Sequence, residues 1–153
     1  MEQVKAAALS RMMRLCSVSE HCRSDIFRKL ETGGVSNPEE IVEQLCKEGY
    51  IDERRYAAAF ARDKSSLQGW GSAKIKLALQ RKGIDKPTIA GALLEIDTEA
   101  ADKKLRSVLE ARWKALRGES DPQKKMAKLF RFALGRGYGY DQIKKIYDTF
   151  RTT

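Results

Sequence analysis

The sequence predicts an all-α protein of three tandem three-helix repeats that form an elongated, curved helical array. Three observations lead to this fold class. Apolar residues recur at the three-to-four spacing of one helical face, no segment shows sustained period-two alternation, and glycines follow the helical runs. The 153 residues, 33% charged and 42% hydrophobic, have the balance of a globular protein.

Apolar stripes predict the helices in chain order. In the first two thirds they are Ile26 and Leu30; Ile41, Val42 and Leu45; Tyr56 and Phe60; Ile75, Ala78 and Leu79; and Ile89, Leu93 and Ile96. Near the C-terminus they are Met126, Leu129, Phe130 and Ala133, then Ile143, Ile146, Tyr147 and Phe150. With the short connections between them, these stripes indicate about nine helices.

Start and stop signals separate the stripes. Asn37-Pro38 predicts a helix start, since asparagine can cap, proline suits the first helical position and Glu40 can reach back to the cap. Asp121-Pro122 follows the same logic. Other predicted N-caps are Asp52, Ser72 and Asp85. The glycines that end helical runs are Gly34, Gly49, Gly83 and Gly137.

An internal repeat is visible when three of these glycines are aligned. Four apolar columns then agree: Ile26, Ile75 and Leu129; Leu30, Leu79 and Ala133; Ile41, Ile89 and Ile143; Leu45, Leu93 and Tyr147. Any helical chain gives some chance matches, but four apolar columns with one glycine column favour true repeats at 1–50, 51–97 and 98–153. Units this small must stack, and they offer an extended binding surface instead of a deep pocket.

The positive charge is concentrated toward the C-terminus. The net charge is +9 overall, and it is −1 in residues 1–51, +3 in 52–97 and +7 in 98–153. Such a surface attracts phosphate backbones or acidic protein faces, although it also occurs on proteins that are merely soluble.

Motifs for catalysis, nucleotide binding and metal binding are absent from the sequence. There is no Walker-type loop, and any histidine-based catalysis would depend on His21. Cys16, Cys22 and Cys46 could form a zinc site with His21, but their spacing fits no common pattern, which favours reduced, buried or half-buried thiols. We therefore expect no enzyme activity, cofactor, metal or small-molecule substrate.

A dense pattern spans residues 49–84. It consists of a Gly-Tyr-Ile-Asp entry, a Tyr-Ala pair with Phe one turn on, a basic residue, Gly-Trp-Gly, an Ile–Leu helix and a closing Lys-Gly-Ile. Its positions are Gly49, Tyr50, Ile51, Asp52, Tyr56, Ala57, Phe60, Arg62, Gly69, Trp70, Gly71, Ile75, Leu79, Lys82, Gly83 and Ile84. This pattern resembles the central signature of the RecX family. The stretch from Ser19 to Leu30 resembles the family's first repeat, and the third repeat is supported mainly by its helical pattern.

The resemblance implies a regulator, usually a negative one, of the RecA recombinase. Such a protein binds RecA and the RecA–DNA filament and modulates strand exchange, ATP hydrolysis and filament growth in recombination, DNA repair and the SOS response. The signature residues have structural explanations: Tyr56 and Phe60 face the core, Gly69 and Gly71 allow a tight link, and Trp70 either covers that link or forms an exposed contact. Asp52 and Gly83 mark a helix start and a helix end.

Basic side chains off the apolar faces are the candidate contacts to RecA or to DNA phosphates. We call them the basic stripe: Lys74, Arg81, Lys82, Lys124, Lys128, Arg131, Lys144 and Lys145. A solvated helix face is the alternative explanation for them. On either explanation Arg81, Lys82, Lys124, Lys128 and Arg131 are expected to lie mostly in solvent.

Two other functions remain open, a stand-alone basic DNA-binding module and a helical adaptor unrelated to RecA. No stretch has the roughly 20 apolar residues of a membrane span, and the N-terminus lacks the layout of a secretory signal. We therefore expect a cytoplasmic protein without a membrane partner.

Overall fold

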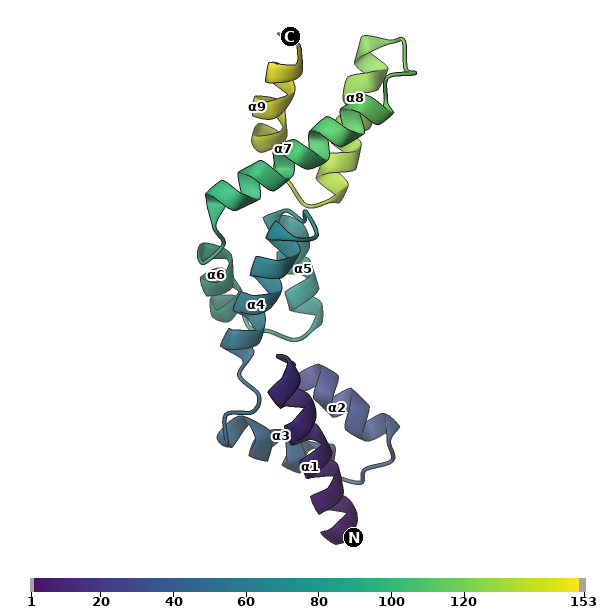
Figure 1. The fold of residues 1–153 in the computed structure, drawn as a ribbon. Helices are drawn as coiled ribbons and strands as arrows, with labels where there is room; N and C mark the ends of the chain where they lie inside the picture. Colours follow the sequence, from purple (N-terminus) through teal and green to yellow (C-terminus); the bar gives the residue numbers. More distant parts are fainter. Residues whose placement is uncertain (1, 152–153) are drawn as a thin grey trace. The chain divides into compact units, whose positions relative to one another are not determined.

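The structure, a computed structural model, describes residues 2–151, and these form nine α-helices and no strand. The helices are α1 Glu2–Val18, α2 Arg23–Thr32, α3 Pro38–Lys47, α4 Glu53–Ser66, α5 Ser72–Arg81, α6 Lys86–Leu94, α7 Thr98–Ala115, α8 Pro122–Gly135 and α9 Tyr140–Arg151 (Figure 1). The predicted all-α class is confirmed. The repeat boundaries stay a prediction, and residues 1, 152 and 153 of the expected first and third repeats lie outside the described range.

Helices begin at or next to all five predicted starts, and two details of the capping differ. Asp52, Asp85 and Asp121 accept hydrogen bonds from backbone N–H groups of the turns that follow them. Asn37 is the N-cap residue of α3, but its side chain accepts no backbone N–H, and its Nδ2 donates to Glu40 Oε2. Ser72 is already the first residue of α5, so it does not occupy the predicted cap position.

The aligned columns of the repeat are almost entirely buried. Leu93 is half-buried, and the other eleven apolar positions have at most 7% of their surface exposed. The glycine column is equally consistent, because Gly34, Gly83 and Gly137 have φ of 80°, 80° and 96°, a left-handed conformation that favours glycine. The sequence periodicity therefore identifies the core of each helix pair correctly.

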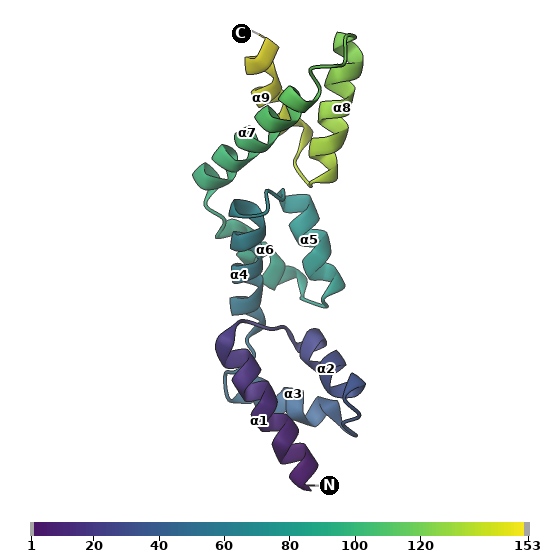
Figure 2. The ribbon, with the colours of Figure 1, turned by 45° about the vertical axis from the view of Figure 1, so that its right-hand side comes forward.

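By packing, the described residues gather into two compact units. Unit 1 comprises residues 2–59 and 79–92, and unit 2 comprises residues 60–78 and 93–151. In unit 1 the core lies among α1, α2 and α3, with the helices side by side in Figures 1 and 2. Its buried members are Ala8, Met12, Cys16, Ile26, Leu30, Ile41, Val42, Leu45 and Ile51.

The core of unit 2 lies among α7, α8 and α9, which form a three-helix bundle (Figure 2). Its buried members are Leu105, Leu109, Leu129, Phe130, Ala133, Tyr138, Ile143, Ile146 and Tyr147. Trp113 completes one side of it, edge-on to Tyr147 and stacked on Phe150 with ring centres 5.7 Å apart in both pairs. Met126, placed on this apolar face by the sequence pattern, is 37% exposed.

Within unit 2 the Gly-Trp-Gly turn before α5 packs directly on the turn between α8 and α9. Gly71 N donates to Arg136 O at 2.7 Å, and Ala73 N donates to Gly137 O at 3.1 Å. A Cβ on Gly71 would lie 2.3 Å from the backbone of Gly137, and a Cβ on Gly137 would lie 2.5 Å from Lys74. Glycine at both positions is therefore required by the close approach of two backbones.

Replacing Gly71 tests this contact. We expect Gly71→Ala to lower the free energy of unfolding by about 1–3 kcal/mol, because the added methyl group meets backbone atoms that cannot move aside locally. Urea denaturation followed by circular dichroism measures the change.

Gly91→Ala in α6 is the matched control. No heavy atom lies within 4 Å of a Cβ built on Gly91, so alanine should stabilise the helix by about 0.4–1 kcal/mol. A Gly71→Ala protein with the denaturation midpoint of the parent would show that the two turns do not approach this closely.

Candidate partner-binding surface

The basic stripe divides between the two units. Arg81 and Lys82 belong to unit 1, and the other six residues belong to unit 2. Four members are exposed and form no ion pair with a described residue: Arg81, Lys124, Arg131 and Lys145. Lys128 Nζ lies 2.8 Å from Glu119, and Lys144 Nζ lies 2.9 Å from Asp148. The stripe is thus a mixture of free and paired cations.

Lys82 departs from the expectation that it lies mostly in solvent. Its side chain is 33% exposed, and its Nζ donates to both carboxylate oxygens of Asp25 at 2.9 and 3.0 Å. Ser24 Oγ donates to the Lys82 carbonyl at 2.7 Å beside this pair. Burial alone would raise the pKa of Asp25, but the hydrogen bonds from Lys82 and Cys22 and the charges of Lys82 and Arg28 together hold the pKa below its usual range.

Two other half-buried cations of unit 1 also pair with carboxylates. Lys5 pairs with Glu40, and Arg23 pairs with Glu43. A pocket of about 430 Å³ in this unit is lined by three cations and three carboxylates: Arg23, Arg28, Lys82, Glu31, Glu39 and Glu53. In this pocket Glu53 Oε2 is buried without a hydrogen-bond partner, and burial raises the pKa of Glu53. No single sign of charge dominates unit 1.

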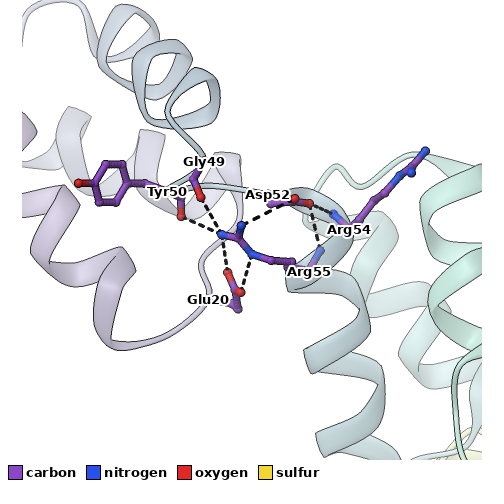
Figure 3. A network of polar contacts seen from close by, with 6 residues as sticks. All are labelled: Glu20, Gly49, Tyr50, Asp52, Arg54 and Arg55. Carbon is purple, nitrogen blue, oxygen red and sulfur yellow. Dashed lines mark hydrogen bonds and ion pairs between the residues drawn. The ribbon is translucent and has the colours of Figure 1, made fainter.

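Arg55 is the most extensively bonded cation of unit 1 (Figure 3). Its Nε and Nη2 donate to the carboxylate of Glu20 at 2.9 and 3.3 Å, and its Nη2 also donates to the carbonyl of Gly49 at 2.9 Å. The guanidinium therefore ties the start of α4 to the chain before α2 and after α3. Figure 3 shows the neighbouring Arg54 side chain pointing away from this network.

In unit 2 some cations pair with carboxylates, as Lys128 and Lys144 do, and others lie over aromatic rings. Lys64 Nζ lies 4.7 Å and Lys74 Nζ lies 4.3 Å from the centre of the Trp70 ring. Arg112 and Arg136 place their guanidinium carbons 4.7 and 5.0 Å from the centre of the Phe132 ring. Every cation–ring contact found among the described residues lies in unit 2.

Several of these cations meet where the Gly-Trp-Gly turn lies against α7 and α8. Arg136 Nη1 donates to Gln68 O at 3.0 Å. A Cβ on Gly69 would lie 3.4 Å from Lys104 Cε and 3.7 Å from Arg136 Nη1. We name the five cations of this region the junction cluster: Lys64, Lys74, Lys104, Arg112 and Arg136. None of them forms an ion pair with a described carboxylate.

Of the junction cluster, only Lys74 was identified from the sequence. The others were missed because they come from α4, α7 and the end of α8, and only the packing of the Gly-Trp-Gly turn brings them together. One signal was available, since Lys104 and Arg112 stand eight residues apart and so lie on one face of a helix. Their proximity to Arg136 could not be predicted from the sequence, because it depends on tertiary contacts.

The remaining signature residues lie at the following places in the structure. Tyr56 is buried, and Trp70 is half-buried against Phe60, with ring centres 6.1 Å apart. Phe60, expected to face the core, is only half-buried. Gly69, with φ of 68°, precedes the close approach of Gly71.

The described residues contain no grouped metal ligands, and their cysteines are free thiols. No three His, Cys, Asp or Glu side chains there are grouped to hold a metal ion. Cys16 and Cys22 are buried and Cys46 is half-buried, all as free thiols, and burial raises the pKa of each. No helix of residues 2–151 is long and apolar enough to cross a membrane.

Comparison with known proteins identifies the family. Residues 52–93 match the family model of the second three-helix domain of RecX, and residues 100–147 match that of the third. A regulatory protein RecX from Escherichia coli O9:H4 is 31% identical over 163 residues, covering 95% of this chain and 92% of the relative. The chain belongs to the RecX family. Its three-helix domains agree with the predicted helical repeat architecture.

Other RecX proteins agree with this membership. A regulatory protein RecX from Clostridium botulinum strain Eklund 17B is 35% identical over 106 residues, 69% of this chain. The chain spans about half of that relative's length, 49%. The crystal structure of RecX from Lactobacillus salivarius superposes with a TM-score of 0.81 over the whole of both chains at 21% identity, which shows the shared fold.

Arg55 and Arg54 form a matched pair for testing the polar network. We expect Arg55→Ala to lower the free energy of unfolding by about 1 kcal/mol, a low value for charge-assisted bonds because the side chain is 48% exposed. Arg54→Ala removes an exposed cation beside it and should change stability by less than about 0.5 kcal/mol. Equal urea midpoints for the two variants would contradict a structural role of Arg55.

The Lys82–Asp25 pair predicts a pH dependence of stability. Because the folded-state pKa of Asp25 is lowered, its contribution is present above the ordinary carboxyl pKa and is lost as the pH falls through the folded-state value. Lys82→Gln should therefore be less stable than the parent at pH 7, and the difference should shrink in acid. Arg81→Gln, exposed and next in sequence, should match the parent at both pH values. A Lys82→Gln deficit that stays constant with pH, measured by urea denaturation, would rule out this pair as its source.

Proposed function

We propose that this chain is a regulator of the RecA recombinase that binds RecA and the RecA–DNA filament and restrains strand exchange, ATP hydrolysis and filament growth. The observation that carries the proposal is the RecX family membership, supported by similarity along 95% of the chain. On this proposal it acts by binding alone, in the cytoplasm, with no reaction, cofactor or membrane of its own.

The charge distribution supports binding to a polyanionic filament. Residues 60–78 and 93–153 contain 18 Lys and Arg against 10 Asp and Glu, a net charge of +8. The rest of the chain contains 12 against 11, a net charge of +1. A surface of one sign raises the association rate with oppositely charged partners. We propose that the stripe residues of unit 2 contribute to this attraction, and that the repeats 1–50, 51–97 and 98–153 are the structural domains that carry it.

The regulatory activity is tested by titrating the protein into RecA on single-stranded DNA. We expect ATP hydrolysis and filament length to fall at substoichiometric to equimolar amounts, and we expect no ATP hydrolysis by the protein alone. Unchanged turnover and unchanged filament length would refute the proposed function. Binding to DNA without either effect would instead favour a stand-alone DNA-binding module.

The contribution of the α8 stripe is tested by the variant Lys124→Glu/Lys128→Glu/Arg131→Glu. All three side chains are exposed, and the Lys128–Glu119 pair is worth at most about 1 kcal/mol, so the variant should remain folded. We expect weaker filament binding, with the salt slope of log K reduced by about 0.7–0.9 for each phosphate that the variant no longer neutralises.

The control for that variant carries the same change of net charge in unit 1: Arg11→Glu/Arg14→Glu/Lys29→Glu. These residues are exposed on α1 and α2 and pair with no described carboxylate. If both variants bind the filament as tightly as the parent at two salt concentrations, the stripe is only a solvated face. If both lose binding equally, net charge matters and the location of the stripe does not.

A further inference from the structure

The cations of the junction cluster differ in their surroundings from the cations of the chain that are paired with carboxylates. In unit 1 the half-buried cations Lys5, Arg23 and Lys82 and the exposed Arg55 are bonded to carboxylates. A carboxylate cancels the charge of its partner at a distance. An aromatic ring carries no net charge, so a cation held over a ring keeps its field. The five cations of the junction cluster are in this second state or lie beside such cations.

The rings also bring these cations close together. Both Nζ atoms of Lys64 and Lys74 lie within 5 Å of the centre of Trp70, so they are at most about 9 Å apart. The same holds for Arg112 and Arg136 around Phe132, whose guanidinium carbons are less than about 10 Å apart. Such separations are within the screening length of about 8–10 Å at physiological salt, so the cations act on a ligand together.

Close cations without counter-charges repel each other, and an anion that binds between them relieves that repulsion. The cluster stands on a rigid base, because Gly71 N is bonded to Arg136 O and Ala73 N to Gly137 O. Little conformational entropy of the backbone is then lost on binding. The cluster therefore fits an anionic partner with several charges in a row.

We propose that the junction cluster binds the phosphodiester backbone of single-stranded DNA. The rings favour a nucleic acid over an acidic protein segment, because Trp70 and Phe132 are only half-buried and the parts of the rings that the cations leave exposed can contact nucleobases. They favour a single strand over a duplex, whose base faces are covered by neighbouring base pairs. This inference deepens the proposed function and rests on it, since it gives the regulator a direct contact to the DNA of the filament.

The test uses the whole protein and a fluorescently labelled oligodeoxythymidylate, with no RecA present. The cluster variant is Lys64→Gln/Lys74→Gln/Lys104→Gln, which removes three charges and leaves the Arg136 bond to Gln68 in place. The control is Arg11→Gln/Arg14→Gln/Lys29→Gln, which removes the same net charge from exposed positions of unit 1. Fluorescence anisotropy at several salt concentrations gives the affinity and its salt slope for each protein.

We expect the parent and the control to bind with similar salt slopes. The cluster variant should lower the slope by about 2, because each single-strand phosphate contact contributes about 0.7, which weakens binding on the order of 100-fold at 0.1 M salt. Equal losses in the cluster variant and the control would overturn the proposal, as would a parent that does not bind the oligonucleotide.

Two further measurements separate loss of charge from loss of stability and DNA from acidic protein. The first uses the variant Lys64→Arg/Lys74→Arg/Lys104→Arg, which keeps all three charges. The proposal predicts that this variant binds nearly as tightly as the parent, even if the glutamine variant is less stable, and a tenfold loss of affinity would count against it. An oligoglutamate peptide probes the acidic-protein alternative, and tight, cluster-dependent binding of it without oligonucleotide binding would overturn the DNA assignment. Because RecA is absent, these outcomes are independent of whether the protein lowers RecA turnover.

Discussion

The close contact between the backbones of Gly71 and Gly137 determines much of unit 2. The start of α5 hydrogen-bonds to the turn that ends α8, at a separation that leaves no room for a Cβ on either glycine. Through this contact a short helical segment gains neighbours that its own repeat does not supply, as small repeats require. The same contact places Trp70, Lys104 and Arg136 in one region of the surface. Packing and the candidate binding chemistry thus depend on one pair of glycines.

The partition of charge follows from which residues surround each cation. In unit 1 carboxylates lie opposite Arg55 and Lys82, so these two cations contribute to the fold and little to the external field. In unit 2 the neighbours of Lys64, Lys74 and Arg112 are rings. Such contacts stabilise each cation by about 0.5–1 kcal/mol at exposed sites without neutralising it. Family membership and the ring-bound cations of the junction cluster therefore both support the proposal that unit 2 contacts a polyanion.

Local periodicity explains what the sequence predicted well. Burial of one face of a helix depends on residues three and four apart, so Ile26, Ile75 and Leu129 were placed in cores from spacing alone. The glycines with positive φ could also be predicted from the sequence, because Gly34, Gly83 and Gly137 each follow a periodic run of apolar residues. The RecX signature fixed the family for the same reason, since its residues keep fixed local spacing.

Contacts between distant residues explain what was missed. Lys82 was placed in the basic stripe because it is not one of the apolar positions of the central repeat, yet its partner Asp25 stands 57 residues away. Arg136 donates to Gln68 across 68 residues, so no spacing rule could join the junction cluster. The pattern of charged residues along one helix shows which cations lie outside the core. The tertiary fold decides which of these cations are paired with a carboxylate.

The most direct test of this account is a lysine acetylation footprint of the protein alone and on RecA filaments assembled on single-stranded DNA, read by mass spectrometry. The account predicts that Lys64, Lys74 and Lys104 of unit 2 lose reactivity on the filament, whereas Lys29 and Lys47, exposed in unit 1, keep theirs. Protection confined to Lys29 and Lys47, with the junction lysines as reactive as in the free protein, would contradict it.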